Sequence, residues 1–177
     1  PSGIRVFLHS LAFGSLGRFF PTDSGKPITQ DQMKMTLDVM AHSLVYWVQS
    51  LVARKLMGKE SRVFAMTSAG GRRVWPSYGP VSAAKAALES HIRQIALELA
   101  PLGITANAIQ AGVTETPAST KIPGYQEMAE AALRLNPSGR MTIPEDVGKA
   151  IVAFSHPHTQ WMTGNVIRVD GGEDITG

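Results

Sequence analysis

Short apolar segments alternate along this chain with longer stretches of helical periodicity, and this alternation restricts the folds that the chain can adopt. The apolar segments, which we expect to be buried strands, are residues 4–8, 62–66, 104–109 and 166–169. The helical stretches are residues 29–57, 80–99 and 125–135, with a further one that opens at Pro144. Helices of this length between strands imply right-handed crossovers and a parallel sheet covered on both faces. We therefore predict an α/β, doubly wound parallel sheet in a single domain over residues 1–177.

The first helical stretch has start and stop signals. Thr29 and Gln32 form a capping-box pattern at its beginning, and Gly58 is suited to end it after Met57. Apolar residues recur between these points as one broad stripe, namely Met33, Leu37, Met40, Leu44, Trp47, Leu51 and Leu56. We expect a single helix whose stripe serves the core.

Composition and charge exclude several classes of function. The net charge of +3 comes from scattered basic residues, without the basic stripe and interleaved aromatics of a nucleic-acid-binding surface. The chain has no cysteine, which excludes disulfides and a thiolate nucleophile and fits a reducing compartment such as the cytoplasm. No run reaches the roughly 18 apolar residues of a membrane span. His9 and His42 have no partner pattern for a metal, so we expect no metal, nucleic acid or membrane as a partner.

The beginning of the chain resembles the interior of a protein. Pro1 is followed almost at once by a strand-like segment, Gly3 to Leu8, where a signal peptide would place a charged and then a long apolar region. We expect the sequence to be a fragment of a longer one.

Polar residues follow three of the expected strands directly. They are His9-Ser10, Thr67-Ser68 and the stretch from Gln110 to Thr116. In open parallel α/β sheets, ligands bind beyond the carboxyl ends of the strands. The sequence therefore predicts a ligand site at this edge of the sheet.

Tyr78 and Lys85 lie seven residues apart at the start of the second helical stretch. Seven residues is close to two helical turns, so the two side chains share a face, about 10 Å apart along the axis. A phenol supported by an ammonium group can protonate an oxygen that gains negative charge when hydride is delivered nearby. From the residue types alone, a packing tyrosine and a solvated lysine fit the same pattern.

The order of these motifs resembles the short-chain dehydrogenase/reductase superfamily over nearly the whole chain. Further matching segments are Asn107 to Gly112 with Thr114 and Thr116, Asn136 to Met141, Pro144 to Val147, Gly164, and Val169 to Gly172. The segment from His9 to Phe13 resembles the divergent branch that contains the bacterial enoyl-acyl-carrier-protein reductases. Ordinary members of the superfamily have Asn-Asn-Ala-Gly there.

The spacing of the catalytic pair resembles the same branch. Most of the superfamily has its tyrosine four residues before the lysine, where this chain has Val81, which cannot donate a proton. Tyr78 lies seven residues before Lys85, as in the enoyl reductases. Many enoyl reductases have a second tyrosine ten residues before the first, and here that residue is Ser68. Ser68 fits either a group that steadies the substrate carbonyl or the cap of a strand end.

The resemblance implies reduction of the 2,3 double bond of an enoyl thioester in fatty-acid synthesis, with hydride from NADH or NADPH. The implied catalytic residues are Tyr78, Lys85 and Ser68, with Tyr78 bonding the enolate oxygen and Lys85 the ribose of the cofactor. The residues implied to contact the cofactor are Ser10, Ala12, Lys85, Gly112, Thr114 and Thr116. Those implied to contact the substrate are Phe13, Tyr78, Tyr125 and Met128. Plainer interpretations remain open, because the threonines suit turns, Phe13 suits the edge of the core, and Met128 suits packing.

One part of the family pattern does not occur in this chain. The glycine-rich turn that holds the cofactor pyrophosphate, and the residue that selects NAD or NADP, have no counterpart here. The resemblance therefore implies the C-terminal portion of a Rossmann-like domain, in a dimer or tetramer, acting on an acyl-carrier-protein or coenzyme A thioester. The alternatives are a carbonyl or dienoyl-CoA reductase of the same superfamily, and a non-catalytic truncated scaffold subunit. The sequence does not distinguish the carrier, the acyl chain length or the cofactor.

Overall fold

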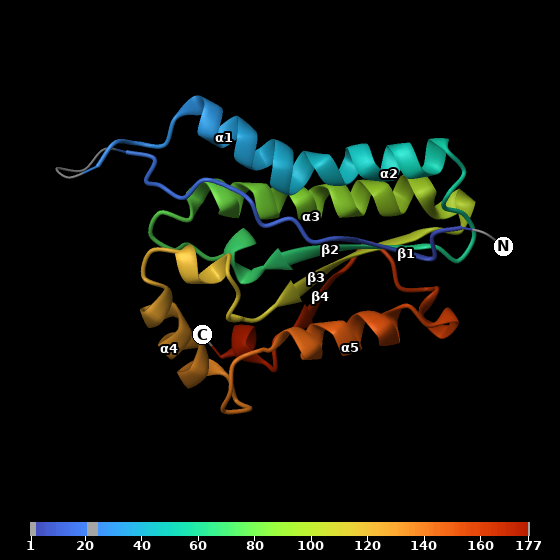
Figure 1. Cartoon of the computed structure of the whole chain (residues 1–177). Helices are drawn as coiled ribbons and strands as arrows, with labels where there is room; N and C mark the ends of the chain where they lie inside the picture. Colours follow the sequence, from blue (N-terminus) through green and yellow to red (C-terminus); the bar gives the residue numbers. More distant parts are fainter. Residues whose placement is uncertain (1–2, 21–24, 177) are drawn as a thin grey trace.

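A computed structural model describes residues 3–20 and 25–176, and a four-stranded parallel sheet lies at its centre. The strands are β1 (Val6–His9), β2 (Arg62–Ser68), β3 (Thr105–Ala111) and β4 (Val166–Val169). They pair in the order β1-β2-β3-β4, and each pair is parallel. Helices cover both faces of this sheet (Figure 1). The α/β doubly wound architecture expected from the sequence is confirmed.

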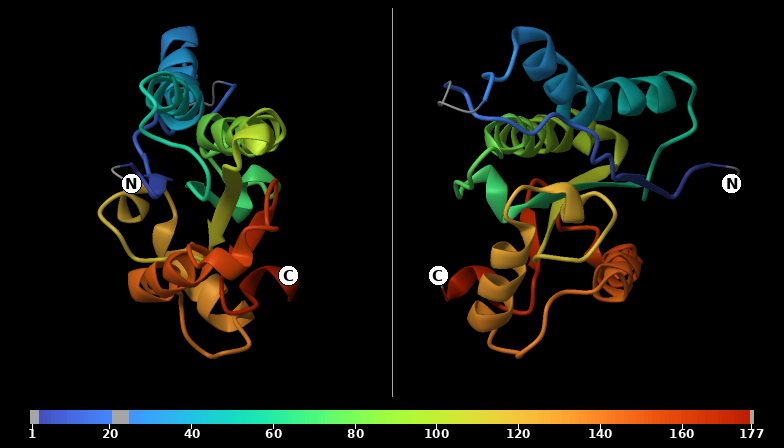
Figure 2. Two further views of the ribbon diagram at one scale, coloured as in Figure 1. Left: turned by 90° about the vertical axis from the view of Figure 1, so that its right-hand side faces the viewer. Right: turned by 60° about the vertical axis from the view of Figure 1, so that its left-hand side comes forward.

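The helices form two layers on opposite sides of the sheet (Figure 2). On one side lie α1 (Gln30–Leu37), α2 (Ser43–Ala53) and the long α3 (Gly79–Leu99). On the other lie α4 (Tyr125–Leu135) and α5 (Pro144–Phe154). Short 3-10 turns lie outside these helices at Ala69–Gly71, Ala100–Leu102, Ser119–Lys121, Pro157–Thr159 and Glu173–Ile175. None of the helices in the described ranges is long and apolar enough to cross a membrane.

The first helical stretch begins where the sequence predicts. Thr29 caps α1, because its Oγ1 accepts a hydrogen bond from the Gln32 backbone N–H at 3.2 Å. In return, the Thr29 backbone N–H donates to Gln32 Oε1 at 2.9 Å, so the capping box is confirmed.

The expectation of one regular helix as far as Met57 is wrong. A π-helical turn, Asp38–His42, separates α1 from α2. Because a π turn spaces its hydrogen bonds by five residues, the buried face continues through Leu44, Val48 and Leu51. The predicted stripe member Trp47 is consequently 55% exposed.

The C-terminal end of this stretch also differs from the prediction. Helix α2 ends at Ala53, and Lys55 takes the left-handed conformation that usually belongs to glycine, with φ of 57°. The Leu56 N–H then donates to Leu51 O at 2.9 Å, and the Lys55 N–H to Val52 O at 2.9 Å. This Schellman arrangement, rather than Gly58, ends the helix and leaves Leu56 39% exposed.

Helix α3 supplies much of the core on one face of the sheet. Its buried residues Ala84, Leu88 and Ile92 are fully inaccessible and pack with α1, α2 and the sheet in the larger of two apolar clusters. The smaller cluster, on the other face of the sheet, contains Phe64, Ile109 and Val147. Strands β2 and β3 are buried on both faces, as parallel strands under two helix layers must be.

Leu88→Ala should lower the free energy of unfolding by about 2–5 kcal/mol, because it opens a cavity where the side chain is fully buried. The matched control is Leu97→Ala on the same helix, where Leu97 is 70% exposed and the loss should stay within about 0.5 kcal/mol. Urea unfolding of both variants measures this difference. Equal losses would contradict the placement of α3.

Candidate active site

The carboxyl ends of β1, β2 and β3 lie side by side, because the three strands are parallel and adjacent. They end at His9, Ser68 and Ala111, so the segments that follow them meet at one edge of the sheet, as the sequence predicts. The amino end of α3, with Tyr78 as its N-cap, reaches the same edge.

Tyr78 and Ser68 are brought together beside Gly70. A Cβ atom at Gly70 would lie 2.5 Å from Tyr78 Cε1 and 3.2 Å from Ser68 Oγ, so the phenol ring lies directly over the Gly70 backbone. Any side chain at position 70 would displace the ring. Glycine is therefore required here by close approach rather than by backbone conformation.

The Tyr78 phenol is mostly buried, and burial raises its pKa above the ordinary value. The nearby Ser68 hydroxyl acts in the opposite direction and has the smaller effect. Ser68 Oγ is itself buried and makes no regular hydrogen bond with any residue that the structure describes. A buried hydroxyl next to a protonated phenol is suited to bind an oxygen of a ligand.

Lys85 is 6% exposed, which is rare for a lysine. Its Nζ donates to Met66 O at 2.7 Å, and burial lowers the pKa of this ammonium group to about 8, partly opposed by Glu89. An ammonium group has three N–H donors, so donors remain after the bond to the carbonyl. The sequence interpretation of Lys85 as a solvated charge does not fit this position.

His9 lies within electrostatic reach of Lys85. Burial, and secondly the charge of Lys85, lower the pKa of His9 to about 4, so the ring is neutral at pH 7. The Ser43 hydroxyl donates to Val39 O at 2.7 Å, and it therefore accepts the bond of 2.8 Å from His9 Nε2. The Nδ1 lone pair is buried, with no partner among the described residues. Apart from the position of His9 at a strand end, no sequence pattern indicates this role.

The loop after β3 is closely packed at Gly112. A Cβ atom there would lie 2.5 Å from Thr142 Oγ1 and 2.7 Å from Glu173 Oε2. Thr114 Oγ1 donates to Gly112 O at 2.9 Å. Thr116 exchanges hydrogen bonds with Ser119, whose Oγ lies 2.9 Å from the Thr116 N. These bonds shape a turn, and both threonines are only half buried.

The segment after β1 is extended and largely exposed. Ser10 and Ala12 are exposed, and Phe13 is 69% exposed. Phe13 therefore does not fill the edge of the core in the described part of the chain.

A cavity of about 340 Å³ opens beside Tyr78. Its lining comes from the loop after β1, the loop before α3 and the first turn of α3, namely Gly17, Arg18, Phe19, Phe20, Val74, Trp75, Ser77, Tyr78, Gly79 and Ser82. The aromatic residues Phe19, Phe20 and Trp75 make it largely apolar. The sequence analysis missed these three residues, although an aromatic pair inside a loop rich in small and polar residues is a signal that could have identified two of them.

Tyr125 and Met128 lie on α4 and are half buried, but they do not line this cavity. The Tyr125 hydroxyl is buried without a partner among the described residues. The segment before α4 does reach the cavity wall, since Trp75 Nε1 donates to Pro123 O at 3.0 Å.

Comparison with known proteins agrees with this geometry. The family described as Enoyl-(Acyl carrier protein) reductase matches residues 2–173. The chain belongs to this family. The resemblance inferred from the motifs is confirmed.

Two curated members of the enoyl-acyl-carrier-protein reductase family illustrate the similarity. The Aquifex aeolicus enoyl-acyl-carrier-protein reductase (NADH) is 30% identical over 176 residues, which is 98% of this chain and 63% of that protein. The Escherichia coli K12 enzyme of the same name is 28% identical over 169 residues, or 96% of this chain and 63% of its own length. The chain therefore spans about 63% of the length of these relatives.

Solved structures of family members have the same fold. The Aquifex aeolicus crystal structure superposes with a TM-score of 0.88 at 29% identity, over 99% of this chain and 67% of that one. The Bacillus cereus reductase, crystallised with NADP+ and an indole naphthyridinone, gives a TM-score of 0.85 at 28% identity. The superposition covers 99% of this chain and 66% of the Bacillus cereus chain.

The buried ammonium group predicts a specific dependence of stability on pH. The pKa of Lys85 is about 8 in the folded chain, against 10.5 as its ordinary value. Between these values the unfolded chain holds a proton that the folded chain has released, so Lys85 makes the free energy of unfolding rise with pH. Relative to Lys85→Met, the parent should gain on the order of 1 kcal/mol per pH unit across this window. Urea unfolding at several pH values, with the exposed Lys149→Met as control, measures the slope. Parallel curves for parent and Lys85→Met would contradict a lowered pKa.

Proposed function

We propose that this chain supplies the nicotinamide and substrate side of an enoyl-thioester reductase of fatty-acid synthesis, acting in the cytoplasm with NADH or NADPH. The observation that carries the proposal is the mostly buried phenol of Tyr78. It lies beside the buried Ser68 hydroxyl and forms part of the wall of an apolar cavity. The similarity to NADH-dependent enoyl-acyl-carrier-protein reductases supports the reaction and NADH, and the Bacillus cereus complex with NADP+ supports NADPH as the alternative.

Tyr78 is suited to stabilise an oxyanion. When the cofactor is bound, it supplies hydride to the β-carbon of the enoyl thioester, and charge develops on the thioester carbonyl oxygen. Because burial raises the pKa of Tyr78, the phenol stays protonated at neutral pH and donates its hydrogen to that oxygen. Ser68 Oγ, next to the same ring, is a second hydroxyl that can orient the carbonyl.

Lys85 would bind the cofactor and keep a positive charge near the reacting groups. Its bond to Met66 O fixes the ammonium group, and its remaining N–H donors suit the hydroxyls of the nicotinamide ribose. With a pKa of about 8, the group remains mostly protonated at pH 7. The neutral His9 ring nearby adds no competing positive charge.

The other site residues from the sequence stay proposals. Ser10, Ala12, Gly112, Thr114 and Thr116 follow strand ends at the same edge, which supports cofactor contact. Phe13, Tyr125 and Met128 stay candidates for substrate contact, and we add Phe19, Phe20 and Trp75 as the acyl-facing wall of the cavity. The apolar lining favours a fatty acyl chain carried on acyl-carrier protein or coenzyme A.

A homo-oligomer, dimer or tetramer, is part of the proposal. Tyr46 and Trp47 are neighbours on α2 and are 53% and 55% exposed. Aromatic side chains of this size are enriched at protein interfaces.

Tyr78→Phe should lower kcat about 10²–10⁴-fold, because it removes one general acid, while the Kd for NADH or NADPH stays nearly unchanged. Reduction of crotonyl thioester, followed by loss of NAD(P)H absorbance in the full natural protein, measures the first quantity. Calorimetry measures the second. Turnover equal to that of the parent would exclude Tyr78 as the acid.

The same assays separate the alternatives. This chain has Ser68 where many enoyl reductases have a second tyrosine, so a ketoacyl thioester is the matched competing substrate. Activity on the ketone alone would favour a carbonyl reductase. An absence of saturable heat with either dinucleotide would favour a non-catalytic scaffold.

A further inference from the structure

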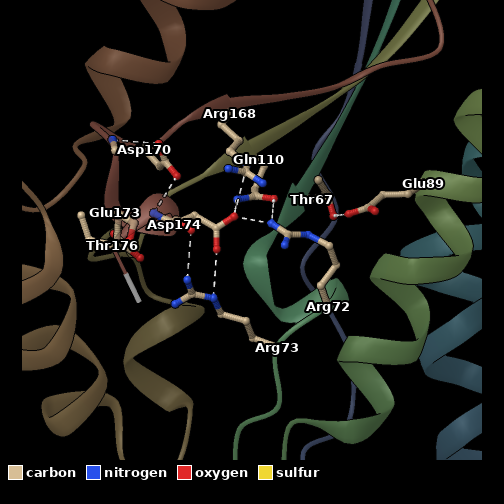
Figure 3. A network of polar contacts seen from close by, with 11 residues as sticks. Thr67, Arg72, Arg73, Glu89, Gln110, Arg168, Asp170, Glu173, Asp174 and Thr176 are labelled. Carbon is tan, nitrogen blue, oxygen red and sulfur yellow. Dashed lines mark hydrogen bonds and ion pairs between the residues drawn. The ribbon is translucent and has the colours of Figure 1, made fainter.

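Asp174 lies in the last short turn of the chain, Glu173–Ile175, at the same edge of the sheet as the proposed site. Its side chain is only 3% exposed, yet three arginines converge on it (Figure 3). Arg73 Nε lies 2.9 Å from Oδ1 and Arg168 Nε lies 3.2 Å from Oδ2. Arg72 Nη2 also pairs with Oδ2, and Gln110 Nε2 donates to the same oxygen at 3.1 Å.

These contacts hold Asp174 in its ionised form. Burial acts to raise the pKa of this carboxyl group, but the hydrogen bonds from Gln110 and Arg72 and the charges of Arg72 and Arg73 together lower it below the ordinary value. The backbone adds to the arrangement, because Arg73 Nη2 donates to Asp174 O at 3.1 Å.

The two neighbouring carboxylates of this turn serve other purposes. Asp170 accepts from the Gly172 N–H at 3.0 Å and from the Asp174 N–H at 3.2 Å, and so shapes the turn itself. Glu173 Oε2 accepts from the Val113 N–H at 3.0 Å and holds the loop after β3. Asp174 is thus the carboxylate of this turn that pairs with both Arg72 and Arg73.

Arg72 and Arg73 belong to the loop that joins Ser68 to Tyr78, residues 69–77. Their backbone N–H groups donate to Ala69 O at 2.9 and 2.8 Å, so a single tight turn connects the two guanidinium groups to Ser68. Gly70, inside that turn, is the residue over which the Tyr78 ring packs. The position of both hydroxyls therefore follows the position of the turn.

The remainder of the loop is held by individual hydrogen bonds that backbone carbonyl groups accept. The Gly17 N–H donates to Ser77 O at 2.8 Å, and Trp75 donates to Pro123 O. By contrast, the anchor at Asp174 combines ion pairs with hydrogen bonds, and charge-assisted bonds are roughly twice as strong as neutral ones.

We propose that Asp174 is a positioning residue that anchors the loop of residues 69–77 to the sheet edge and so holds Ser68 and Tyr78 in their working geometry. The inference rests on the proposed function for its catalytic consequence. Catalytic groups must be held within about 0.5 Å of their productive positions. An error of about 1 Å from a change remote from the chemistry can cost about 10²-fold in rate.

The test compares Asp174→Asn with Asp146→Asn in the full natural protein. Both substitutions remove the charge of a carboxylate that pairs with arginine, but Asp146 pairs with Arg140 at the start of α5, outside the loop. Three quantities are measured: kcat and KM for crotonyl thioester, the rate of trypsin cleavage after Arg72 and Arg73, and the titration of Tyr78 by NMR of ¹³Cζ-labelled tyrosine. Tyr78→Phe assigns the resonance.

Asp174→Asn should lower kcat about tenfold or more, with KM changed less than threefold or so. Trypsin should cut after Arg72 or Arg73 several-fold faster. The pKa of Tyr78 should fall toward its ordinary value, because burial is the larger cause of its elevation. Asp146→Asn should leave all three quantities near those of the parent.

Unchanged cleavage and unchanged Tyr78 titration in Asp174→Asn would overturn the anchor. A released loop with unchanged kcat, or an equal loss of kcat in Asp146→Asn, would overturn the positioning role. If the parent does not reduce the enoyl thioester, the proposed function fails, and cleavage and titration still decide the anchor. Should Asp174→Asn not fold, Arg72→Gln removes one of the ion pairs of Asp174, at a half-exposed arginine. It should change kcat, the cleavage rate and the pKa of Tyr78 in the same directions by smaller amounts.

Discussion

Parallel pairing of β1, β2 and β3 is the constraint on which the proposed site depends. It brings three strand ends, at His9, Ser68 and Ala111, to one edge, although their loops are far apart in sequence. The pairing is stabilised because both faces of β2 and β3 are buried under helices. Helix α3 then returns to this edge with Tyr78 at its amino end.

Burial moves the two titrating groups of the candidate site in directions that suit one reaction. It raises the pKa of the Tyr78 phenol, which stays a donor, and it lowers the pKa of Lys85 without neutralising it at pH 7. The cost of the buried ammonium group is offset by the bond to Met66 O and by the carboxylate of Glu89. Glu89 is in turn held by Thr67 Oγ1 at 2.7 Å. The strand that carries Ser68 therefore also supports Lys85.

Local signals in the sequence were enough to predict the sheet, the order of the elements and most helix boundaries. Helix α4 begins at Tyr125 and α5 at Pro144, as the patterns indicate. The π turn could not be predicted, because apolar residues at both Trp47 and Val48 fit helical spacing and only tertiary packing selects one of them. The end of α2 at Lys55 lacked its usual glycine signal.

The candidate site was predictable where it depends on motifs and unpredictable where it depends on contacts between distant segments. Tyr78 and Lys85 were identified from their spacing, and Ser68 from its distance to Tyr78. The pairing of Asp174 with Arg72 spans 102 residues, and the meeting of Phe19 with Gly79 depends on the path of a loop. Residue spacing along the chain cannot predict such contacts, because none of these residues lies in a local sequence pattern.

The π turn sets the register of α2 and thereby the hydrogen bond between α2 and the end of β1. Ser43 is the first residue after it and holds the His9 ring. If the segment Asp38–His42 became an ordinary α-helix without a change in length, one flank would rotate by about 100° relative to the other. Ser43 would then turn away from His9, and Trp47 would compete with Val48 for the core. The positions of Ser43 and Val48 therefore depend on this turn remaining π-helical.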